Sequence, residues 1–191
     1  MRLVSCALIF MKSLIDKLEA THALALEEYV QLIEQHTQAD SDYLFARARE
    51  VRRYHFGSSV YLRGLIEISS YCHNDCFYCG IRRSNTTAER YRLSDEQILS
   101  CCKQGHELGL KTFVLQGGED SKFSDERMVN LISTIKERYP DCAITLSIGE
   151  RKRESYQRMF EAGADRYLMR IETTDKDLYH KLDPNMSWDR R

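Results

Sequence analysis

Three cysteines stand close together at Cys72, Cys76 and Cys79, with C-x3-C-x2-C spacing. Thiolates are soft ligands that suit iron–sulfur clusters or zinc. A cubane cluster of four irons is ordinarily held by four thiolates, so three thiolates in one short loop leave one iron open to another ligand. The spacing therefore indicates a redox-active metal centre that does chemistry, rather than a structural clip.

A zinc site is the alternative interpretation, in which His73 or the adjacent pair Cys101 and Cys102 would complete four ligands. Zinc sites usually come as two paired half-sites, and this loop offers only one group of thiols. The remaining thiols, Cys6, Cys101, Cys102 and Cys142, are expected to be small buried hydrophobic side chains rather than ligands.

The composition excludes some classes of partner. The chain has 191 residues and a formal net charge of −1, so there is no strong electrostatic case for nucleic acid or an anionic membrane. Its cysteines cluster unevenly, which indicates metal binding in a reducing compartment. The apolar run before Met11 is too short for a membrane span, and it makes a poor signal peptide. We expect a cytoplasmic protein, with Met1 and Met11 both open as the start.

Strand and helix alternate from Tyr61 onward. Predicted strands cover residues 61–69, 111–116, 143–148 and 166–172, and predicted helices cover residues 94–108, 124–139, 154–162 and 175–182. This alternation predicts βαβ units and a parallel sheet. Residues 13–56 have apolar spacing typical of helices, with a second helix over 42–55 capped by residues 40–42. We expect a helical segment in residues 1–58 and one α/β domain in residues 59–191.

Polar residues and glycines follow each predicted strand, and the carboxyl ends of parallel strands are where α/β barrels place their active sites. After the cysteine loop, these groups are Gln116, Gly117, Gly118, Glu119 and Asp120, then Ser147, Gly149 and Glu150, and finally Arg170 and Glu172. Arg170 and Glu172 alternate along the last strand, so they should share a face and need either a zwitterionic ligand or an ion pair. Each group has a purely structural alternative: a turn for the glycines and strand-end capping for Ser147. Glu67 and Lys111 are expected to be solvated or structural.

The cysteine spacing, with Tyr78 just before the third thiol, resembles the motif of the radical S-adenosylmethionine (SAM) superfamily. The resemblance implies a TIM-type (β/α)8 barrel and a [4Fe-4S] cluster on Cys72, Cys76 and Cys79. In that superfamily the amino and carboxylate groups of SAM chelate the fourth iron. One electron from the cluster then splits SAM into methionine and a 5′-deoxyadenosyl radical, which attacks the substrate.

Longer segments resemble HydE, the radical SAM maturase family of [FeFe]-hydrogenase; they lie at residues 61–69, 79–83, 90–93, 113–120, 145–150 and 162–170. This resemblance implies that Tyr78 packs beside the cluster and that Gln116 to Glu119 form a segment that binds the SAM amino group. It also implies SAM contacts for Ser147, Glu172 and Arg191, and a place near the substrate for Arg170.

The implied function is assembly of the diiron subcluster of [FeFe]-hydrogenase. The implied partners are a small iron- and cysteine-derived substrate, a low-potential electron donor and other hydrogenase maturation proteins. A methylornithine synthase-like radical SAM enzyme, an inactive remnant and a zinc-binding module stay open as alternatives.

One departure concerns length, because a complete (β/α)8 barrel takes about 250 residues. Only the first four strands are predicted, so we expect the first half of a barrel whose C-terminal half is missing. A truncated product or a partial sequence is the expected explanation. Such a chain should bind a cluster poorly and turn over little substrate, because one wall of the pocket is absent.

Overall fold

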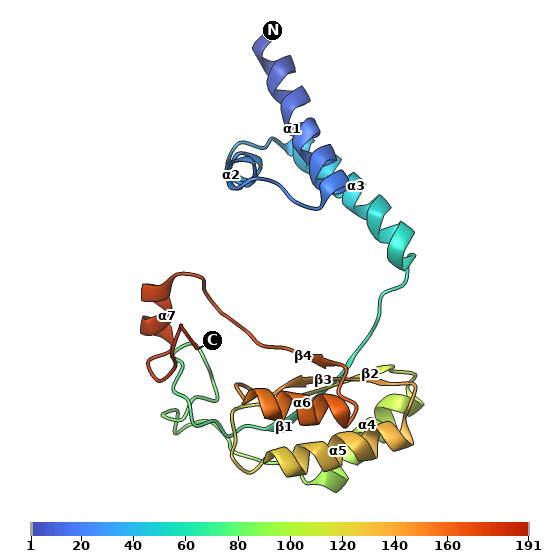
Figure 1. Cartoon of the computed structure of the whole chain (residues 1–191), viewed down its shortest axis with the longest axis vertical. Coiled ribbons are helices and arrows are strands. Elements are labelled where there is room, and N and C mark those ends of the chain that lie inside the picture. Colours follow the sequence, from blue (N-terminus) through green and yellow to red (C-terminus); the bar gives the residue numbers. More distant parts are fainter. Residues whose placement is uncertain (1, 191) are drawn as a thin grey trace. The chain divides into compact units, whose positions relative to one another are not determined.

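The computed structural model describes residues 2–190, with side chains from Phe10 onward. The chain divides into two compact units, Met1–Tyr61 and Leu62–Arg191 (Figure 1). The first unit is helical, and the second contains a parallel sheet with helices.

The first unit consists of α1 (Arg2–Thr21), α2 (Leu26–Glu34) and α3 (Gln38–Phe56). An ion pair at 2.6 Å between Arg47 and Glu19 joins α3 to α1. Helix α3 begins earlier than predicted because Thr37 is its N-cap. The Thr37 hydroxyl accepts from the Asp40 N–H, and the Asp40 carboxylate accepts from the Thr37 N–H. None of the helices in residues 2–190 combines the length and apolar character that a membrane crossing needs.

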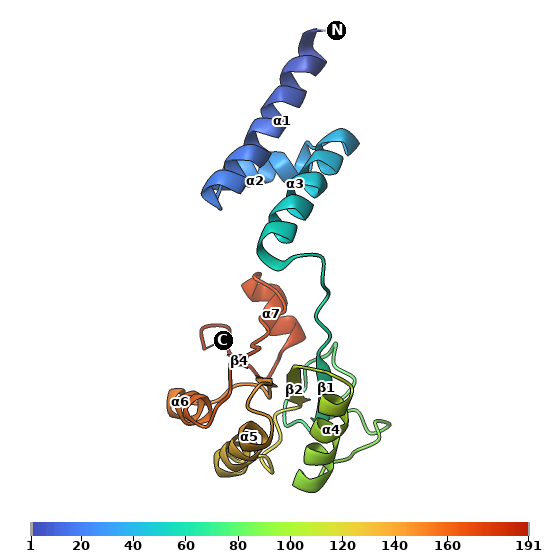
Figure 2. The same cartoon turned by 90° about the vertical axis from the view of Figure 1, so that its right-hand side faces the viewer.

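Four parallel strands form the sheet of the second unit: β1 (Gly64–Ser69), β2 (Thr112–Gly117), β3 (Ala143–Ser147) and β4 (Arg166–Tyr167). Helices α4 (Asp95–Glu107), α5 (Asp125–Arg138) and α6 (Arg153–Glu161) follow the first three strands and lie on one side of the sheet (Figure 2). Helix α7 (Lys176–Leu182) follows β4. Neighbours in the sheet are neighbours in sequence, which is the strand order of a barrel rather than of a doubly wound sheet. The predicted fold class is confirmed.

The core of this unit lies between the sheet and helices α4 to α6. Its fully buried members include Ile68, Ile98, Phe113, Leu115, Met128, Ile132, Ile135, Ile144 and Leu146. Because side chains alternate along a strand, the residues between these face the opposite side of the sheet. On β1, for example, Ile66 and Ile68 are buried, whereas Leu65, which precedes Ile66, is 55% exposed.

Side-chain caps mark the starts of α4, α5 and α7. The Ser94 hydroxyl accepts from the Gln97 N–H at 3.2 Å, and the Gln97 side-chain carbonyl accepts from the Ser94 N–H at 2.8 Å. This capping box begins α4, as predicted. Ser124 caps α5 and Asp175 caps α7 through single hydrogen bonds to the backbone.

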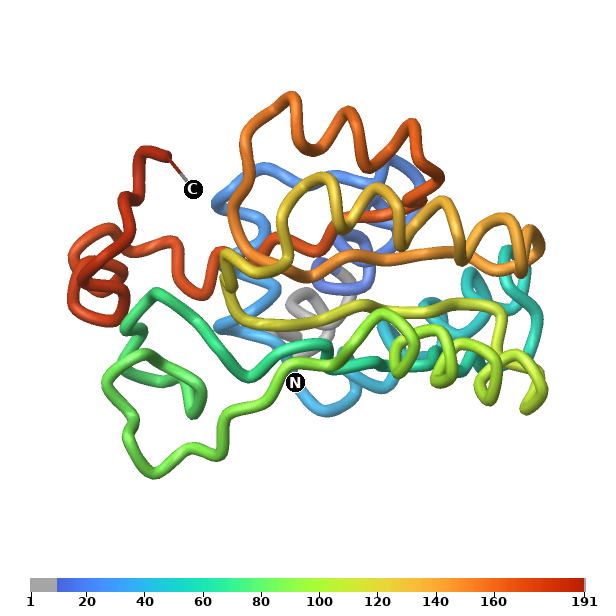
Figure 3. Tube along the Cα trace, turned by 90° about the horizontal axis from the view of Figure 1, so that it is seen from below, coloured from blue at the N-terminus to red at the C-terminus, as the bar shows by residue number. Residues whose placement is uncertain are grey.

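Strand β4 is much shorter than the predicted strand over residues 166–172. It pairs with β3 only at Arg166 and Tyr167, and one further hydrogen bond joins the Leu168 N–H to the Leu146 carbonyl at 2.8 Å. The chain then leaves the sheet, and Glu172 takes a left-handed backbone conformation with φ of 64°. β3 ends at Ser147, one residue beyond its last pair with β4, so β4 has no neighbouring strand with which to continue. The segment runs on to α7, beside the cysteine loop (Figure 3).

Candidate metal centre and adjoining cavity

The three cysteines of the predicted metal centre lie in the loop that follows β1, and all three are half-buried. The Cys79 N–H donates to the Cys76 carbonyl at 3.0 Å, which folds the second and third cysteines into a turn. Burial raises the pKa of Cys72, and the nearby charges of Glu119 and Cys79 raise it further. Burial, followed by the carboxylate of Asp183, raises the pKa of Cys76 to about 12. Metal binding must therefore displace protons from this loop.

Arg90 holds the second part of the cysteine loop in place. Its guanidinium donates to the carbonyl oxygens of Ser70, Ile81, Arg82 and Asn85, with the last three at 2.8, 2.7 and 3.0 Å. Each of these carbonyls belongs to a segment without regular secondary structure, where backbone groups have no ladder partner. One side chain thus supplies the hydrogen bonds that a helix or sheet would otherwise provide.

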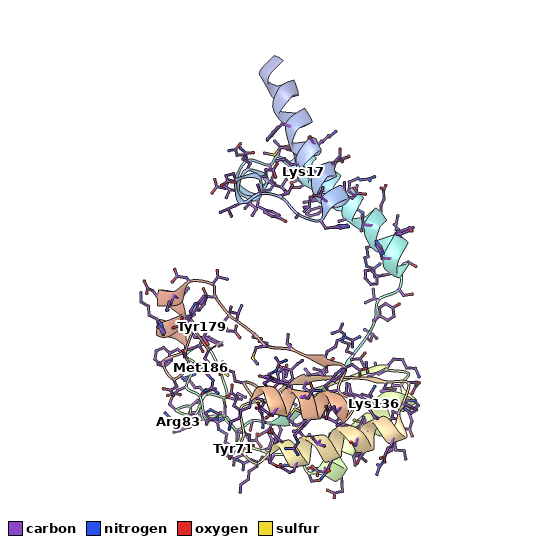
Figure 4. All side chains as sticks on the ribbon, in the orientation of Figure 1. Lys17, Tyr71, Arg83, Lys136, Tyr179 and Met186 are labelled. Carbon is purple, nitrogen blue, oxygen red and sulfur yellow. The ribbon has the colours of Figure 1, made fainter. Side chains whose placement is uncertain are left out.

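Helix α7 braces the same loop from the other side. The Tyr78 hydroxyl donates to the Asp183 carboxylate at 3.1 Å, and the Phe77 N–H donates to the Leu182 carbonyl at 2.9 Å. The Met186 sulfur lies 3.9 Å from the thiol of the second cysteine. Tyr71, Arg83 and Met186 all lie at this end of the sheet (Figure 4). Asp183 is only 1% exposed, and no sequence signal connects it with Tyr78.

The Gly-Gly segment at the end of β2, Gly117 and Gly118, packs directly on the start of the cysteine loop. A Cβ at Gly118 would lie 2.3 Å from the Tyr71 carbonyl oxygen and 2.6 Å from the Cys72 Cβ, so only glycine permits this approach. The next residue completes the junction, because the Glu119 carbonyl accepts from the His73 N–H at 3.2 Å and contacts the His73 ring nitrogen Nδ1 at 2.8 Å.

The Glu119 side chain turns toward the loop after β3. Its carboxylate accepts from the Glu150 N–H at 3.0 Å. Gly149, with φ of 79°, leaves the space that this side chain fills: a Cβ there would lie 1.9 Å from the Glu119 Cγ. The loops after β1, β2 and β3 are therefore interlocked through consecutive residues of one Gly-Gly-Glu segment.

A buried carboxylate, Asp120, lies beneath these loops at the end of the predicted polar group that follows β2. Asp120 is 5% exposed and accepts from the Ser69 hydroxyl at 2.6 Å and from two nitrogens of Arg92. The Arg92 guanidinium also lies 3.6 Å from the centre of the Tyr71 ring. Burial acts to raise the pKa of Asp120, but the hydrogen bonds from Arg92 and Ser69 outweigh it, and the net pKa lies below its ordinary value.

A cavity of about 580 Å³ adjoins the cysteine loop at the carboxyl ends of the strands. This volume lies within the usual range for small-molecule sites, about 300–1,000 Å³. Its lining includes Cys76, Tyr78, Cys79, Gln116, Gly117, Gly118, Glu119, Ser147, Arg170 and Glu172. The structure thus brings most of the predicted site residues to one space. Cys72 lies in the same loop outside this lining, and Arg191 lies outside the described residues.

Glu67 also lines this cavity, whereas the sequence reasoning treated it as a solvated or structural residue. In the register of the sheet, Glu67 stands opposite Gln116, and Gln116 stands opposite Ser147. The three side chains form one polar layer across the sheet, on the face opposite the core. The alternation along β1, with buried Ile66 and Ile68 on either side of Glu67, was the signal that could have placed it.

Arg170 and Glu172 reach the cavity, but not as predicted. They lie beyond β4, so the expectation that they share a strand face is wrong. The strand ends after Tyr167 for lack of a paired partner. Both side chains are exposed, and the Arg170 guanidinium donates to the Gln116 side-chain carbonyl at 3.4 Å.

The model of one protein family, the radical SAM superfamily, matches residues 66–191, which include most of β1, the cysteine loop and the three other strands. The chain belongs to the radical SAM superfamily. Enzymes of this superfamily generally use a [4Fe-4S] cluster and SAM.

Two curated relatives give the resemblance more detail. The chain is 42% identical over 148 residues to the [FeFe] hydrogenase maturase subunit HydE of Thermotoga maritima, which covers 78% of this chain and 42% of HydE. It is 32% identical over 181 residues to the 3-methylornithine synthase of Methanosarcina barkeri, which covers 94% of this chain and 51% of that protein. The chain therefore spans about half the length, or less, of the curated relatives it matches.

Solved radical SAM structures have the same fold. Methylornithine synthase (PylB) superposes with a TM-score of 0.81 at 31% identity, covering 92% of this chain and 52% of that chain. The [FeFe]-hydrogenase maturase HydG superposes with a TM-score of 0.82 at 23% identity, covering 92% of this chain and 40% of that chain, which supports the fold alone.

The cysteine loop offers three half-buried thiols, the ligand type that iron–sulfur clusters take. Within the described residues, a separate group of three donors, His106, Asp141 and Cys142, has ligand atoms that all lie within 4.8 Å of one another.

The other cysteines differ in their environment. Cys102 and Cys142 are buried at 0% and 1% exposure, as predicted. The prediction is wrong for Cys101, which is exposed because α4 turns that side of the helix toward solvent. The side chain of Cys6 lies outside the described residues.

Proposed function

We propose that this chain binds a [4Fe-4S] cluster through Cys72, Cys76 and Cys79 and binds SAM in the cavity beside it. The single observation that carries this proposal is the convergence of the cysteine loop, the Gly-Gly segment, the end of β3 and the polar residues beyond β4 on one cavity. When bound, this pair of cofactors supplies an electron that splits SAM reductively into methionine and a 5′-deoxyadenosyl radical. The protein supplies binding, orientation and shelter.

Each wall of the cavity has a proposed role. The three thiolates hold three irons and leave one for the amino and carboxylate groups of SAM. The Gln116–Glu119 segment lies against the cysteine loop, where it is proposed to meet the SAM amino group. Ser147 contacts SAM from the end of β3 and Glu172 from the segment beyond β4, and Arg191 joins them on the strength of the resemblance. Tyr78 packs beside the cluster with its hydroxyl held by Asp183.

Arg170 is proposed to act on the substrate rather than on SAM. It is the cationic side chain at the cavity next to the polar layer of Glu67, Gln116 and Ser147. A guanidinium here is suited to a carboxylate, which it binds through two parallel hydrogen bonds. A cysteine-derived substrate carries such a group.

We infer a role in assembly of the diiron subcluster of [FeFe]-hydrogenase, by analogy with HydE. The identity of 42% to a HydE, against 32% to a methylornithine synthase, supports this reading. The role requires a small iron- and cysteine-derived substrate, a low-potential electron donor and other maturation proteins, in the cytoplasm. Residues 59–191 would then form the first half of the radical SAM core, and residues 1–58 a helical segment before it.

The test is electron paramagnetic resonance of the anaerobically reconstituted, dithionite-reduced chain, with and without SAM. We expect a [4Fe-4S]+ signal that shifts when SAM is added. The variant Cys79→Ala should lose the signal, whereas Cys101→Ala, at an exposed cysteine on α4, should keep it. A signal indifferent to SAM, or equal signals in the two variants, would contradict the proposal.

Methylornithine synthase activity is the second candidate, supported by the TM-score of 0.81 with the solved PylB structure. Two assays separate the candidates. One measures activation of [FeFe]-hydrogenase in a host that lacks its own HydE. The other measures 3-methylornithine in the same host by mass spectrometry. Formation of 3-methylornithine without hydrogenase activation would replace the first candidate with the second.

A further inference from the structure

A second group of metal-binding side chains lies outside the proposed cluster site. His106 comes from the end of α4, and Asp141 and Cys142 come from the junction between α5 and β3. Their ligand atoms all lie within 4.8 Å of one another. The group combines an imidazole nitrogen, a carboxylate oxygen and a thiol sulfur, which are the three donor types found at zinc sites.

Two of the separations match the edges of a tetrahedron around one zinc ion. The His106 Nε2 lies 3.4 Å from the Asp141 Oδ1, and the Cys142 Sγ lies 3.8 Å from that same oxygen. Zinc bonds of about 2.0 Å to nitrogen, 2.1 Å to oxygen and 2.3 Å to sulfur place tetrahedral donors about 3.4 Å and 3.6 Å apart. These two separations therefore lie within about 0.2 Å of the tetrahedral values.

Neighbouring groups hold each donor in orientation. The Lys111 ammonium pairs with the Asp141 Oδ2, which leaves Oδ1 directed at the other two donors. The Tyr139 ring lies 4.8 Å from the His106 ring, at an interplanar angle of 33°. Such outer contacts are typical of metal sites, where they fix carboxylate and imidazole ligands.

The site is open on one side and closed on the other. The side chains of His106 and Asp141 are 37% and 50% exposed, so a metal ion and a water molecule have access. Cys142 is 1% exposed, and its thiol contacts the Leu110 carbonyl at 3.6 Å. The buried thiol of Cys142 would thus bind a metal ion from the protein side, and His106 and Asp141 from the solvent side.

From this geometry we infer that His106, Asp141 and Cys142 form a zinc site with water as the fourth ligand. The inference is independent of the proposed SAM chemistry, because the site lies at the amino ends of β2 and β3. Lys136, which donates to the Cys142 carbonyl at 2.8 Å, marks that end, opposite Tyr71 and Met186 (Figure 4). There the metal would join the end of α4 to the start of β3 and stabilise the unit.

The test uses the full chain with the three loop cysteines replaced by alanine, so that cluster ligands do not contribute. Cobalt(II) serves as the spectroscopic probe, and zinc(II) as its competitor. We expect one cobalt per chain, with intense tetrahedral d–d bands and a thiolate-to-cobalt charge-transfer band, both lost on adding zinc. Zinc should also raise the melting temperature.

Single variants in this background decide the outcome. Cys142→Ala should abolish the charge-transfer band, and His106→Gln, at a half-exposed side chain that carries little risk to folding, should weaken binding by about 10-fold or more. Cys102→Ala is the matched control, because that cysteine is equally buried but outside the group of donors. Cobalt binding without a thiolate band would overturn the inference, as would binding that survives both Cys142→Ala and His106→Gln. An equal loss of binding in Cys102→Ala would also overturn it.

Discussion

Replacing Arg90 by lysine should weaken the proposed cluster site without touching any cysteine. The guanidinium donates to four carbonyl oxygens of the loop segments on either side of the third cysteine. Lysine keeps the positive charge but loses the planar fork of donors that reaches several carbonyls at once. The loop should therefore sample open conformations in which the thiols no longer converge.

The expected magnitude follows from the number of bonds lost. A hydrogen bond to a charged group contributes about 1.5–3 kcal/mol, and lysine retains one or two of the four. Arg90 is only half-buried, so the freed carbonyls regain water and the loss should be about 2–3 kcal/mol rather than the full sum. At about 1.36 kcal/mol per factor of ten, iron binding should weaken about 30- to 150-fold.

The assay is anaerobic reconstitution with ferrous iron and sulfide against a graded chelator, followed by measurement of iron and sulfide bound per chain. Arg83→Lys is the matched control: Arg83 is in the same loop, but its side chain makes none of the hydrogen bonds or ion pairs seen in residues 10–190. Arg90→Lys chains that hold iron as tightly as the unaltered chain would refute the reasoning. So would an equal loss in Arg83→Lys.

Three further predictions concern the same region. Gly118→Ala should destabilise the chain by about 1–3 kcal/mol in a denaturant titration, because the added Cβ would meet the cysteine loop. Gly80→Ala is the control: a Cβ there would meet no atom within 4 Å, so stability should change by less than about 0.5 kcal/mol. In the metal-free chain at neutral pH, iodoacetamide should label the exposed Cys101 before Cys76, because the pKa of Cys76 is raised to about 12. Mass spectrometry after timed quenching measures the order of labelling. Faster labelling of Cys76 would contradict the prediction. The pKa of Asp120 is lowered in the folded chain, so its contribution to stability is present above its unfolded pKa of about 3.9 and is lost as the pH falls through the lower folded pKa. Denaturant titrations of Asp120→Asn across this acid range should show a flatter pH dependence than the unaltered chain, and identical slopes would count against this assignment.

Local patterns in the sequence were sufficient for the order and type of the elements. The Ser94–Gln97 capping box and the apolar run at residues 113–115 both depend on neighbours within a few residues, and both appear as predicted. The cysteine spacing likewise indicated the family, because the motif is continuous in sequence. The same reasoning failed at β4, where strand length depends on how far the neighbouring strand continues.

Only the tertiary structure decided which side chains hold the loops of the candidate site in place. Tyr78 and Asp183 are separated by 105 residues, and Ser69 and Asp120 by 51, yet each pair is joined by a hydrogen bond. Periodicity and motif spacing describe how a residue relates to its own element, and they carry no information on which distant polar group packing will bring within 3 Å. The sequence by itself therefore determined the family, the parallel sheet and the place of the cysteine loop after the first strand. Only the folded chain determined that Arg90 and Asp183 hold that loop, because their partners meet it after the strands have assembled.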